Sequence, residues 1–225
     1  MSHSTFDNNM RKAIKISVFF IAILWVIQSA GVLFNLPLRT LGVIPGDWTR
    51  FYGVFTSAWV HGSYEHLTHN TLAILILLTG LHYGYPKVAS KVFLLSWLGS
   101  GLGVWLFARD SVHLGASGIT HGLFFFLFIA GIVRRDKRSV VLLMIAFFLY
   151  GGMIMTIFPR EPHISFEAHF FGGVAGVIAA AFFARKDEKL AEKRYSWEDE
   201  DEDDPIIGDD WRTSSSEDYT VDGKD

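Results

Sequence analysis

The sequence predicts an all-α membrane protein, built as a six-transmembrane-helix bundle. The first observation is composition: half of the 225 residues are hydrophobic, 20 are phenylalanine, and the most acidic stretch is confined to the end of the chain. A chain this apolar is not an ordinary soluble domain. The second observation is that long apolar stretches alternate with connections whose basic residues fall mainly on one side.

Six apolar stretches are each long enough, at about 20 residues, to cross a hydrocarbon core of roughly 30 Å. Because lipid offers no water to bond with the backbone, each stretch is expected to be a helix. The first stretch has no small-residue cleavage site and is longer than a signal-peptide core, so it is expected to be retained. The stretches are residues 14–34, 64–83, 88–107, 115–133, 139–157 and 166–184.

The basic residues set the expected orientation. Lys and Arg lie before the first stretch, around the link between the second and third, between the fourth and fifth, and after the sixth. The other side carries only Arg39, Arg50, Arg109 and Arg160. By the positive-inside rule, both termini lie in the cytoplasm. The expected parts are a cytoplasmic N-terminus (1–13), a six-helix domain (14–184) and a basic, then acidic, disordered cytoplasmic tail (185–225).

Four polar residues are expected at one depth in the membrane. The second, fourth and sixth helices all run from outside to inside, so their first turns, which hold or adjoin His66, Asn70, Ser117 and His169, share one level. Unpaired polar groups are costly there, so their coincidence predicts an internal site reached by water. The short basic loops fit a bacterial inner membrane with the site open to the periplasm, although an organelle membrane with equivalent topology would give the same pattern.

Ser117 stands among small residues at the start of the fourth helix, with Gly115 and Ala116 before it and Gly118 after it. Its hydroxyl is near the unpaired N–H groups and the positive end of that helix, which suits a nucleophile with an oxyanion site. His169 could take its proton as a general base and later return it to a leaving amine. Alternatively, Ser117 is a small packing residue and His169 joins helices by a hydrogen bond.

His66 and Asn70 are four residues apart and therefore share one face of the second helix. Together with the backbone N–H of Ser117 they could stabilise an oxyanion, a term of roughly 3–4 kcal/mol per donor in other enzymes. Helix capping or interfacial anchoring is the alternative role. His61 precedes the helix and is expected to organise the loop or the water of the site rather than to react.

Gly172 and Gly176 follow His169 on about the same face of the sixth helix. They are expected to let this helix approach the fourth closely enough for Ser117 and His169 to meet. General helix packing would need the same glycines without any chemistry. No carboxylate is well placed to orient His169, so a Ser–His dyad is expected rather than a triad.

Other chemistries are disfavoured. The chain has no cysteine, which excludes disulfides, cysteine catalysis and thiolate metal sites. Several histidines lie near the outer half, but Asn70 and Ser117 are poor partners for zinc, so neither a metal nor another cofactor is expected. The charge distribution shows no nucleic-acid footprint.

Three connecting or flexible parts carry further expectations. Residues 35–60 are too apolar for a free loop and are expected to lie partly in the membrane interface. The proline-containing link 158–165 is a candidate cap over the site. The fifth stretch, with Gly151-Gly152 as a weak point, is the candidate lateral gate.

Three segments resemble the rhomboid family of intramembrane serine proteases, in the order and topology of that family, over residues 14–184 of this chain. The resemblance implies that Ser117 is the nucleophile, His169 the base, and His66 and Asn70 the side-chain oxyanion donors. It also implies substrates that are single-pass membrane proteins, entering from lipid and cut near their outer end. The segments are His61-Gly-Ser-Tyr-Glu-His66-Leu-Thr-His-Asn70, Gly115-Ala-Ser117-Gly118 and Ala168-His169-Phe-Phe-Gly172-Gly-Val-Ala-Gly176.

Two positions depart from the family pattern. Tyr52-Gly53 stands where members often carry a Trp-Arg pair in the first outside loop, so the anchoring of this loop is expected to differ. His121 stands where members can present a tyrosine packed on the catalytic imidazole. One turn below Ser117, His121 is expected either to stack on His169 or to compete for its proton.

The expected function is an intramembrane serine endopeptidase whose partners are single-pass transmembrane substrates and the lipid bilayer, with homo-oligomer formation left open. The alternative is a catalytically silent rhomboid-like protein that binds or escorts membrane proteins, which should lack the nucleophile or the base. A transporter would need discontinuous helices and charged midplane sites, and the sequence shows neither.

Overall fold

The computed structural model describes residues 3–159 and 164–188. Within these ranges the chain is helical and forms no strand, which confirms the predicted all-α class; Val43 and His113 form an isolated β-bridge. Most of the predicted tail and part of the predicted cap lie outside the described residues. The elements are α1 (His3–Leu33), η1 (Leu38–Leu41), η2 (Trp48–Arg50), α2 (Gly53–Thr56), η3 (Ser57–Trp59), α3 (Tyr64–Gly84), α4 (Ala89–Phe107), α5 (Ser117–Arg134), α6 (Lys137–Tyr150), η4 (Gly151–Ile157) and α7 (Phe166–Phe183), where η denotes a 3-10 helix.

Five segments of the described ranges are long and apolar enough to cross a membrane: Asn9–Leu33, Ala89–Phe107, Ser117–Arg134, Lys137–Ile157 and Phe166–Phe183. They fit an integral, multi-pass membrane protein. The remaining predicted span, α3, is a helix of 21 residues that is not among these five. Its polar residues, His66, His69, Asn70 and His82, lower its mean hydropathy.

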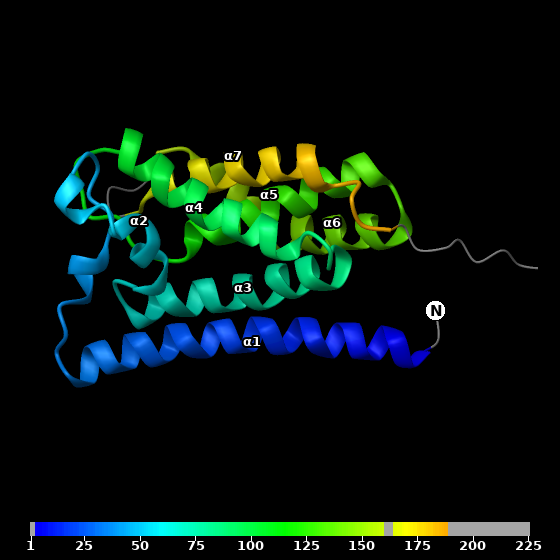
Figure 1. The fold of residues 1–225 in the computed structure, drawn as a ribbon, viewed down its shortest axis with the longest axis horizontal. Helices are drawn as coiled ribbons and strands as arrows, with labels where there is room; N and C mark the ends of the chain where they lie inside the picture. Colours follow the sequence, from blue (N-terminus) through cyan, green and yellow to red (C-terminus); the bar gives the residue numbers. More distant parts are fainter. Residues whose placement is uncertain (1–2, 160–163, 189–225) are drawn as a thin grey trace, which may run out of the picture. The chain divides into compact units, whose positions relative to one another are not determined.

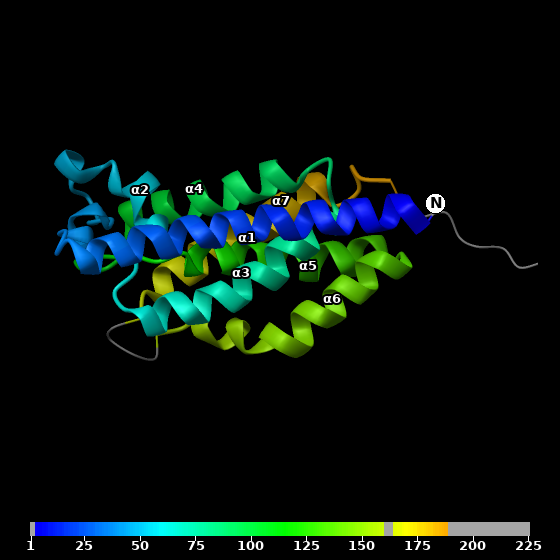
Figure 2. The ribbon, with the colours of Figure 1, turned by 90° about the horizontal axis from the view of Figure 1, so that it is seen from below.

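α5 is the central helix of the bundle (Figures 1 and 2). It packs against α3, α4, α6 and α7, whereas α1 packs chiefly on α3 at the edge. Residues on all sides of α5 are buried, including Phe124, Phe126 and Leu127, which are essentially inaccessible. A helix that is apolar all round belongs in such a position.

The backbones of α5 and α7 touch through glycines. A Cβ atom at Gly172 would overlap the carbonyl oxygen of Gly118, and one at Gly176 would overlap the carbonyl oxygen of Gly122. The predicted close approach of the two helices is therefore confirmed, and it uses glycines on both of them. As a result, the first turn of α7, with His169, lies beside the first turn of α5.

The end of α1 is a Schellman motif. The N–H of Leu36 donates to the carbonyl oxygen of Gly31 at 2.8 Å, and Asn35 adopts φ 51°. Asparagine tolerates this left-handed conformation better than most residues, so the helix stops here and the chain turns back. The side chain of Leu38 then packs directly on Gly31, in space that a Cβ atom would occupy.

The connection 35–60 is folded onto the bundle. The hydroxyl of Tyr52 donates to the carbonyl oxygen of Thr40 at 3.1 Å, and the Arg50 guanidinium also donates to that oxygen. The rings of Trp48 and Phe51 pack edge-on against Trp105 of α4, with centroids 4.5 and 5.1 Å away. These contacts anchor the loop around Tyr52-Gly53, where a Trp-Arg pair is absent.

The fifth apolar stretch changes its winding at the two glycines. α6 ends at Tyr150, and the chain continues from Gly151 as the 3-10 helix η4. The predicted weak point at Gly151-Gly152 is thus a change of helix type rather than a continuous α-helix. Because η4 packs against α7, it carries Thr156 to the predicted site.

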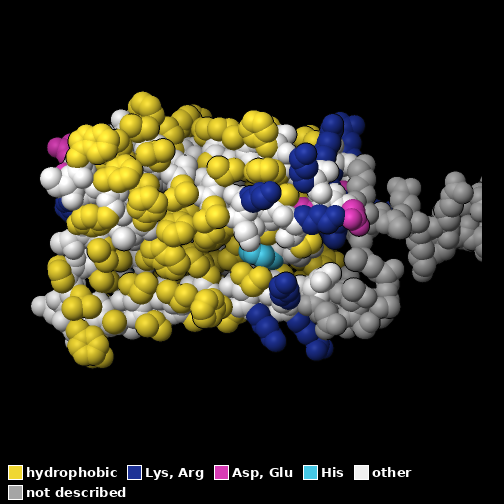
Figure 3. Space-filling view, viewed as in Figure 1, with side chains coloured by type: hydrophobic (Ala, Val, Ile, Leu, Met, Phe, Trp, Pro, Cys, Tyr) yellow, Lys and Arg dark blue, Asp and Glu magenta, His cyan; other side chains and the backbone are white. Residues whose placement is uncertain are grey.

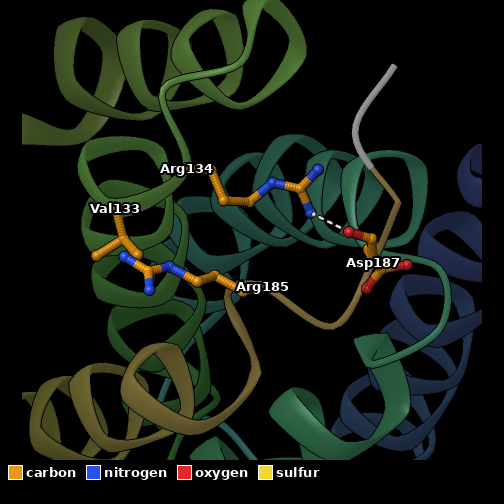
Figure 4. Close-up of a pocket in the computed structure, with 4 residues that line it drawn as sticks. All are labelled: Val133, Arg134, Arg185 and Asp187. Carbon is orange, nitrogen blue, oxygen red and sulfur yellow. Dashed lines mark hydrogen bonds between the residues drawn. The ribbon is translucent and has the colours of Figure 1, made fainter. Parts of the chain in front are cut away.

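Basic residues gather at the end of the bundle where α6 begins and α7 ends (Figure 3). The buried Arg134, at the end of α5, donates through Nε to Asp136 at 2.8 Å and through Nη1 to the backbone carbonyl of Asp187 at 3.0 Å (Figure 4). Arg134 and Asp187, together with Val133 and Arg185, line a cavity of about 240 Å³. Arg134 thereby ties the segment after α7 to the rest of the bundle.

Candidate active site

Ser117 begins α5 directly after a turn that requires glycine. Gly115 has φ 112°, a conformation in which an L-residue would be strained, and its N–H donates to the carbonyl oxygen of Ser57 at 2.9 Å. Ser117 is half-buried. As the first helical residue it has an N–H without an acceptor inside its own helix, which leaves that donor available to a ligand.

His66 lies against this turn. A Cβ atom placed on Gly115 would be 2.5 Å from Cε1 and 2.9 Å from Nε2 of the His66 ring. The absence of a side chain at Gly115 therefore allows the imidazole of α3 to reach the start of α5. The structure thus brings the His66 ring to the turn that precedes Ser117.

Asn70 lies one turn further along α3 and is 5% exposed. Its Nδ2 atom is buried and has no hydrogen-bond partner among the described residues. A buried donor without an acceptor costs about 1–3 kcal/mol, which is tolerated where the acceptor arrives with a ligand. His69, by contrast, is exposed and does not share this position.

His61 supports the turn from the other side. Its Nε2 accepts a hydrogen bond from the N–H of Ala116 at 3.4 Å, and its ring meets the ring of His66 edge-on at 5.2 Å. Burial, assisted by the nearby His66, lowers the pKa of His61 to about 3. His61 is therefore neutral at pH 7 and acts as an acceptor for the loop that precedes Ser117.

His169 is buried on α7, and its ring orientation is set by a backbone carbonyl. Its Nδ1 lies 3.0 Å from the carbonyl oxygen of Thr156. Because a carbonyl can only accept, Nδ1 carries the proton, and Nε2 of the neutral ring keeps its lone pair. A backbone carbonyl thus orients this ring, and the expected Ser–His dyad stays a prediction.

His121 stacks on His169. The two rings are 3.9 Å apart and within 9° of parallel, which is one of the two arrangements expected. The Nδ1 of His121 lies 2.7 Å from the carbonyl oxygen of Ser117, and its Nε2 lies 2.8 Å from Oγ1 of Thr156. His121 therefore links the first turn of α5 to η4, and it covers one face of the His169 ring.

No hydrogen bond joins the Ser117 hydroxyl to His169 in the described part of the chain. The two residues are held near each other indirectly, by the glycine contacts between α5 and α7 and by His121, which touches both. Catalytic hydrogen bonds are often long before substrate binds and shorten in the complex. Ser117 and His169 therefore lie on adjacent helix turns, and the hydrogen bond that proton transfer would need is not formed in this state.

Thr156 and two side-chain contacts at the start of α7 were not predicted from the sequence. Thr156 had one available signal, because it is a polar residue at the end of an apolar stretch. At the start of α7, the Ser165 hydroxyl forms a hydrogen bond with Nδ1 of His113 at 2.7 Å, and Glu167 forms an ion pair with Arg109 at 3.5 Å. These contacts fix the segment before α5 to the first turn of α7. Glu167 thus faces Arg109 and does not orient His169.

The comparisons with known proteins decide the family. The model of the rhomboid domain matches residues 48–186, which is more than half of the chain. The chain belongs to the rhomboid family. This rhomboid is 28% identical over 184 residues to an uncharacterized protein, Rv1337, of Mycobacterium tuberculosis, with 76% of this chain and 75% of the relative covered. It is also 28% identical over 159 residues to a Bacillus subtilis protein named "Putative rhomboid protease YdcA", with 66% and 74% covered.

Proposed function

We propose that this rhomboid is an intramembrane serine endopeptidase that cuts transmembrane segments of single-pass membrane proteins near their outer end. Ser117 is its nucleophile and His169 its general base. The observation that carries the proposal is the bond from Nδ1 of His169 to the Thr156 carbonyl. It fixes the neutral tautomer whose Nε2 can receive a proton, on a helix turn packed beside Ser117.

The acylation step follows from these positions. The Ser117 oxygen attacks the scissile carbonyl carbon while its proton passes to Nε2 of His169, giving a tetrahedral oxyanion and an imidazolium. When the carbon–nitrogen bond breaks, the imidazolium returns the proton to the leaving amine. Water, deprotonated by the same nitrogen, then releases the new carboxyl end from Ser117.

The oxyanion receives donors from two helices. The Ser117 N–H lies at the start of α5, and Asn70 and His66 lie four residues apart in the first turns of α3. Asn70 supports the assignment most directly, because its buried donor has no partner among the described residues. An oxyanion would supply the missing acceptor in the transition state, when the interaction contributes to rate.

The proposal places the protein in a membrane with six spanning helices and both termini in the cytoplasm. The gathering of basic residues at one end of the bundle supports this orientation (Figure 3). α3 would then be the sixth span, and its polar residues would face the interior of the bundle rather than lipid. The named relatives come from bacteria, which supports a bacterial inner membrane with the site on the periplasmic side.

One observation favours the second candidate, a catalytically silent rhomboid-like protein that binds membrane proteins. The Ser117 hydroxyl makes no hydrogen bond to His169 in the described residues, so the nucleophile is not engaged by its base in this state. A serine-reactive fluorophosphonate probe separates the two functions. Labelling of wild-type protein, lost in Ser117→Ala and in His169→Ala, supports an activated serine. An unlabelled wild type that binds membrane proteins supports the silent form.

A further inference from the structure

A second cavity, of about 520 Å³, lies at the C-terminal end of α1, between that helix and the connection that follows it. It is separate from the turn that holds Ser117, but His61 contributes to its wall. Its position beside the end of a membrane-spanning helix places it at the membrane–water interface in the proposed topology. The residues that line it are Gln28, Gly31, Val32, Asn35, Leu36, Pro37, Leu38, Arg39, Thr40 and His61.

Two buried side chains that line this cavity have an unsatisfied polar atom. Gln28 is 5% exposed, and its Oε1 has no partner among the described residues; His61 is 4% exposed, and its Nδ1 also has none. Because Nε2 of His61 accepts from Ala116, the proton of the neutral ring lies on Nδ1. The wall of the cavity therefore holds one unused donor and one unused acceptor, both closed to solvent in this state, which a ligand would reach through a shift of the two side chains. A hydroxyl group can satisfy both, by accepting from His61 and donating to Gln28.

The rim of the cavity carries a cation. Arg39 is exposed, and its guanidinium makes no hydrogen bond or ion pair within the part of the chain that the structure describes. Guanidinium groups bind phosphate strongly and often through two parallel hydrogen bonds. At about 520 Å³ the cavity is also far larger than a single water molecule needs. Its chemistry fits a phosphate ester that carries hydroxyl groups.

We propose that this cavity binds the headgroup of an anionic, hydroxyl-bearing phospholipid of the phosphatidylglycerol type. The lipid phosphate lies at Arg39, and a glycerol hydroxyl bridges Nδ1 of His61 and Oε1 of Gln28. A lipid is chosen over a free phosphoglycerol because the end of α1 lies at the depth of lipid headgroups. The inference needs the membrane location of the proposed function but not its chemistry.

A ligand bound in the cavity acts on the proposed active site through His61. The ring of His61 holds the Ala116 N–H through Nε2 at 3.4 Å and touches the lipid hydroxyl through Nδ1. A bound headgroup thus fixes the ring that supports the turn before Ser117. His61 is a positioning residue in this scheme, because it acts on the nucleophile only through the backbone of the loop.

Lipid binding is tested without proteolysis, on the full-length Ser117→Ala protein, by native mass spectrometry after exchange into mixed lipids. Phosphatidylglycerol should be retained at least fivefold more than phosphatidylcholine, and more than phosphatidic acid, which has the phosphate without the glycerol hydroxyls. Arg39→Gln should abolish the preference over phosphatidylcholine, and Gln28→Leu the preference over phosphatidic acid. Arg11→Gln, a charge-matched change near the opposite end of α1, should alter neither preference.

Three results would overturn the inference. The first is equal retention of phosphatidylglycerol and phosphatidylcholine by the protein with Arg39 and Gln28 intact. The second is unchanged lipid retention in both variants. The third is displacement of the lipid by millimolar free glycerol phosphate, which would assign the cavity to a soluble ligand. Because lipid binding is measured on an inactive variant, its result does not depend on whether the protein is a protease.

Discussion

Thr156 contacts both histidines of the site. Its backbone carbonyl orients His169, and its hydroxyl meets Nε2 of His121 at 2.8 Å. These two roles can be separated, because a side-chain substitution removes the hydroxyl and leaves the carbonyl in place. The side chain therefore acts on His169 only through the stacked ring of His121.

Replacing Thr156 by alanine should reduce kcat for cleavage about fivefold to tenfold, because a hydrogen bond is worth about 1 kcal/mol. Thr156→Ser should restore most of the rate, since it returns the hydroxyl. His121→Phe should keep measurable activity, because a flat ring can still stack on His169. Steady-state kinetics in liposomes give these values; a Thr156→Ala rate equal to wild type would show that the Thr156 hydroxyl does not contribute to cleavage.

His61 makes the stability of the protein depend on pH. Burial lowers its pKa to about 3, from an ordinary value of 6.5, so the folded state disfavours the charged ring. Its contribution is fully present above pH 6.5 and is lost progressively as pH falls toward 3, by up to about 1.4 kcal/mol per pH unit. His61→Asn keeps an acceptor for the loop without titrating. Melting temperatures measured between pH 7 and 4 should therefore fall less for this variant than for wild type; parallel curves would contradict the prediction.

At the scale of elements, the contact between α5 and α7 depends on the absence of side chains. Gly172→Ala would drive a methyl group into the carbonyl oxygen of Gly118 and should destabilise the protein by about 1–3 kcal/mol, while also moving His169. Gly152→Ala is the matched control, because nothing lies within 4 Å of a Cβ atom there. Thermal unfolding in detergent should separate the two; equal melting temperatures would show that α7 can shift without cost.

The length of the apolar stretches predicted where the helices lie. The depth and spacing of the polar residues on α3, α5 and α7 predicted that they share one level of the bundle, and their roles in a site stay predictions. Thr156 offered only its polarity at the end of an apolar stretch, and the 3-10 winding from Gly151, which sets where its carbonyl lies, leaves no periodic signal in the sequence. The hydrogen bonds of His113 and Arg109 with the start of α7 were also missed, since they join segments far apart in the sequence. Side-chain pairs of this kind depend on how helices pack, which periodicity does not record.

At the scale of the whole bundle, Arg134 joins the ends of several helices. Its side chain is 1% exposed and pairs with Asp136, whose side chain is 8% exposed, and its guanidinium also donates to the chain beyond α7. Arg134→Met should cost about 3–5 kcal/mol, because it leaves Asp136 without its cation and the carbonyl oxygens of Ala184, Asp187 and Glu188 without this donor. The exposed Lys186→Gln should be neutral. Chemical or thermal unfolding measures both stabilities. Similar losses of stability in the two variants would show that the buried Arg134 does not hold the helix ends together.

The measurement that tests the central claim most directly is cleavage of a single-pass membrane substrate by the purified protein in liposomes. Wild type, Ser117→Ala and His169→Ala should be compared at equal protein and lipid content, with folding of each variant verified by its melting temperature. The proposed Ser–His mechanism predicts a product from wild type alone, cut near the outer end of the substrate's transmembrane segment. Equal product from wild type and folded Ser117→Ala would contradict the proposed Ser–His mechanism.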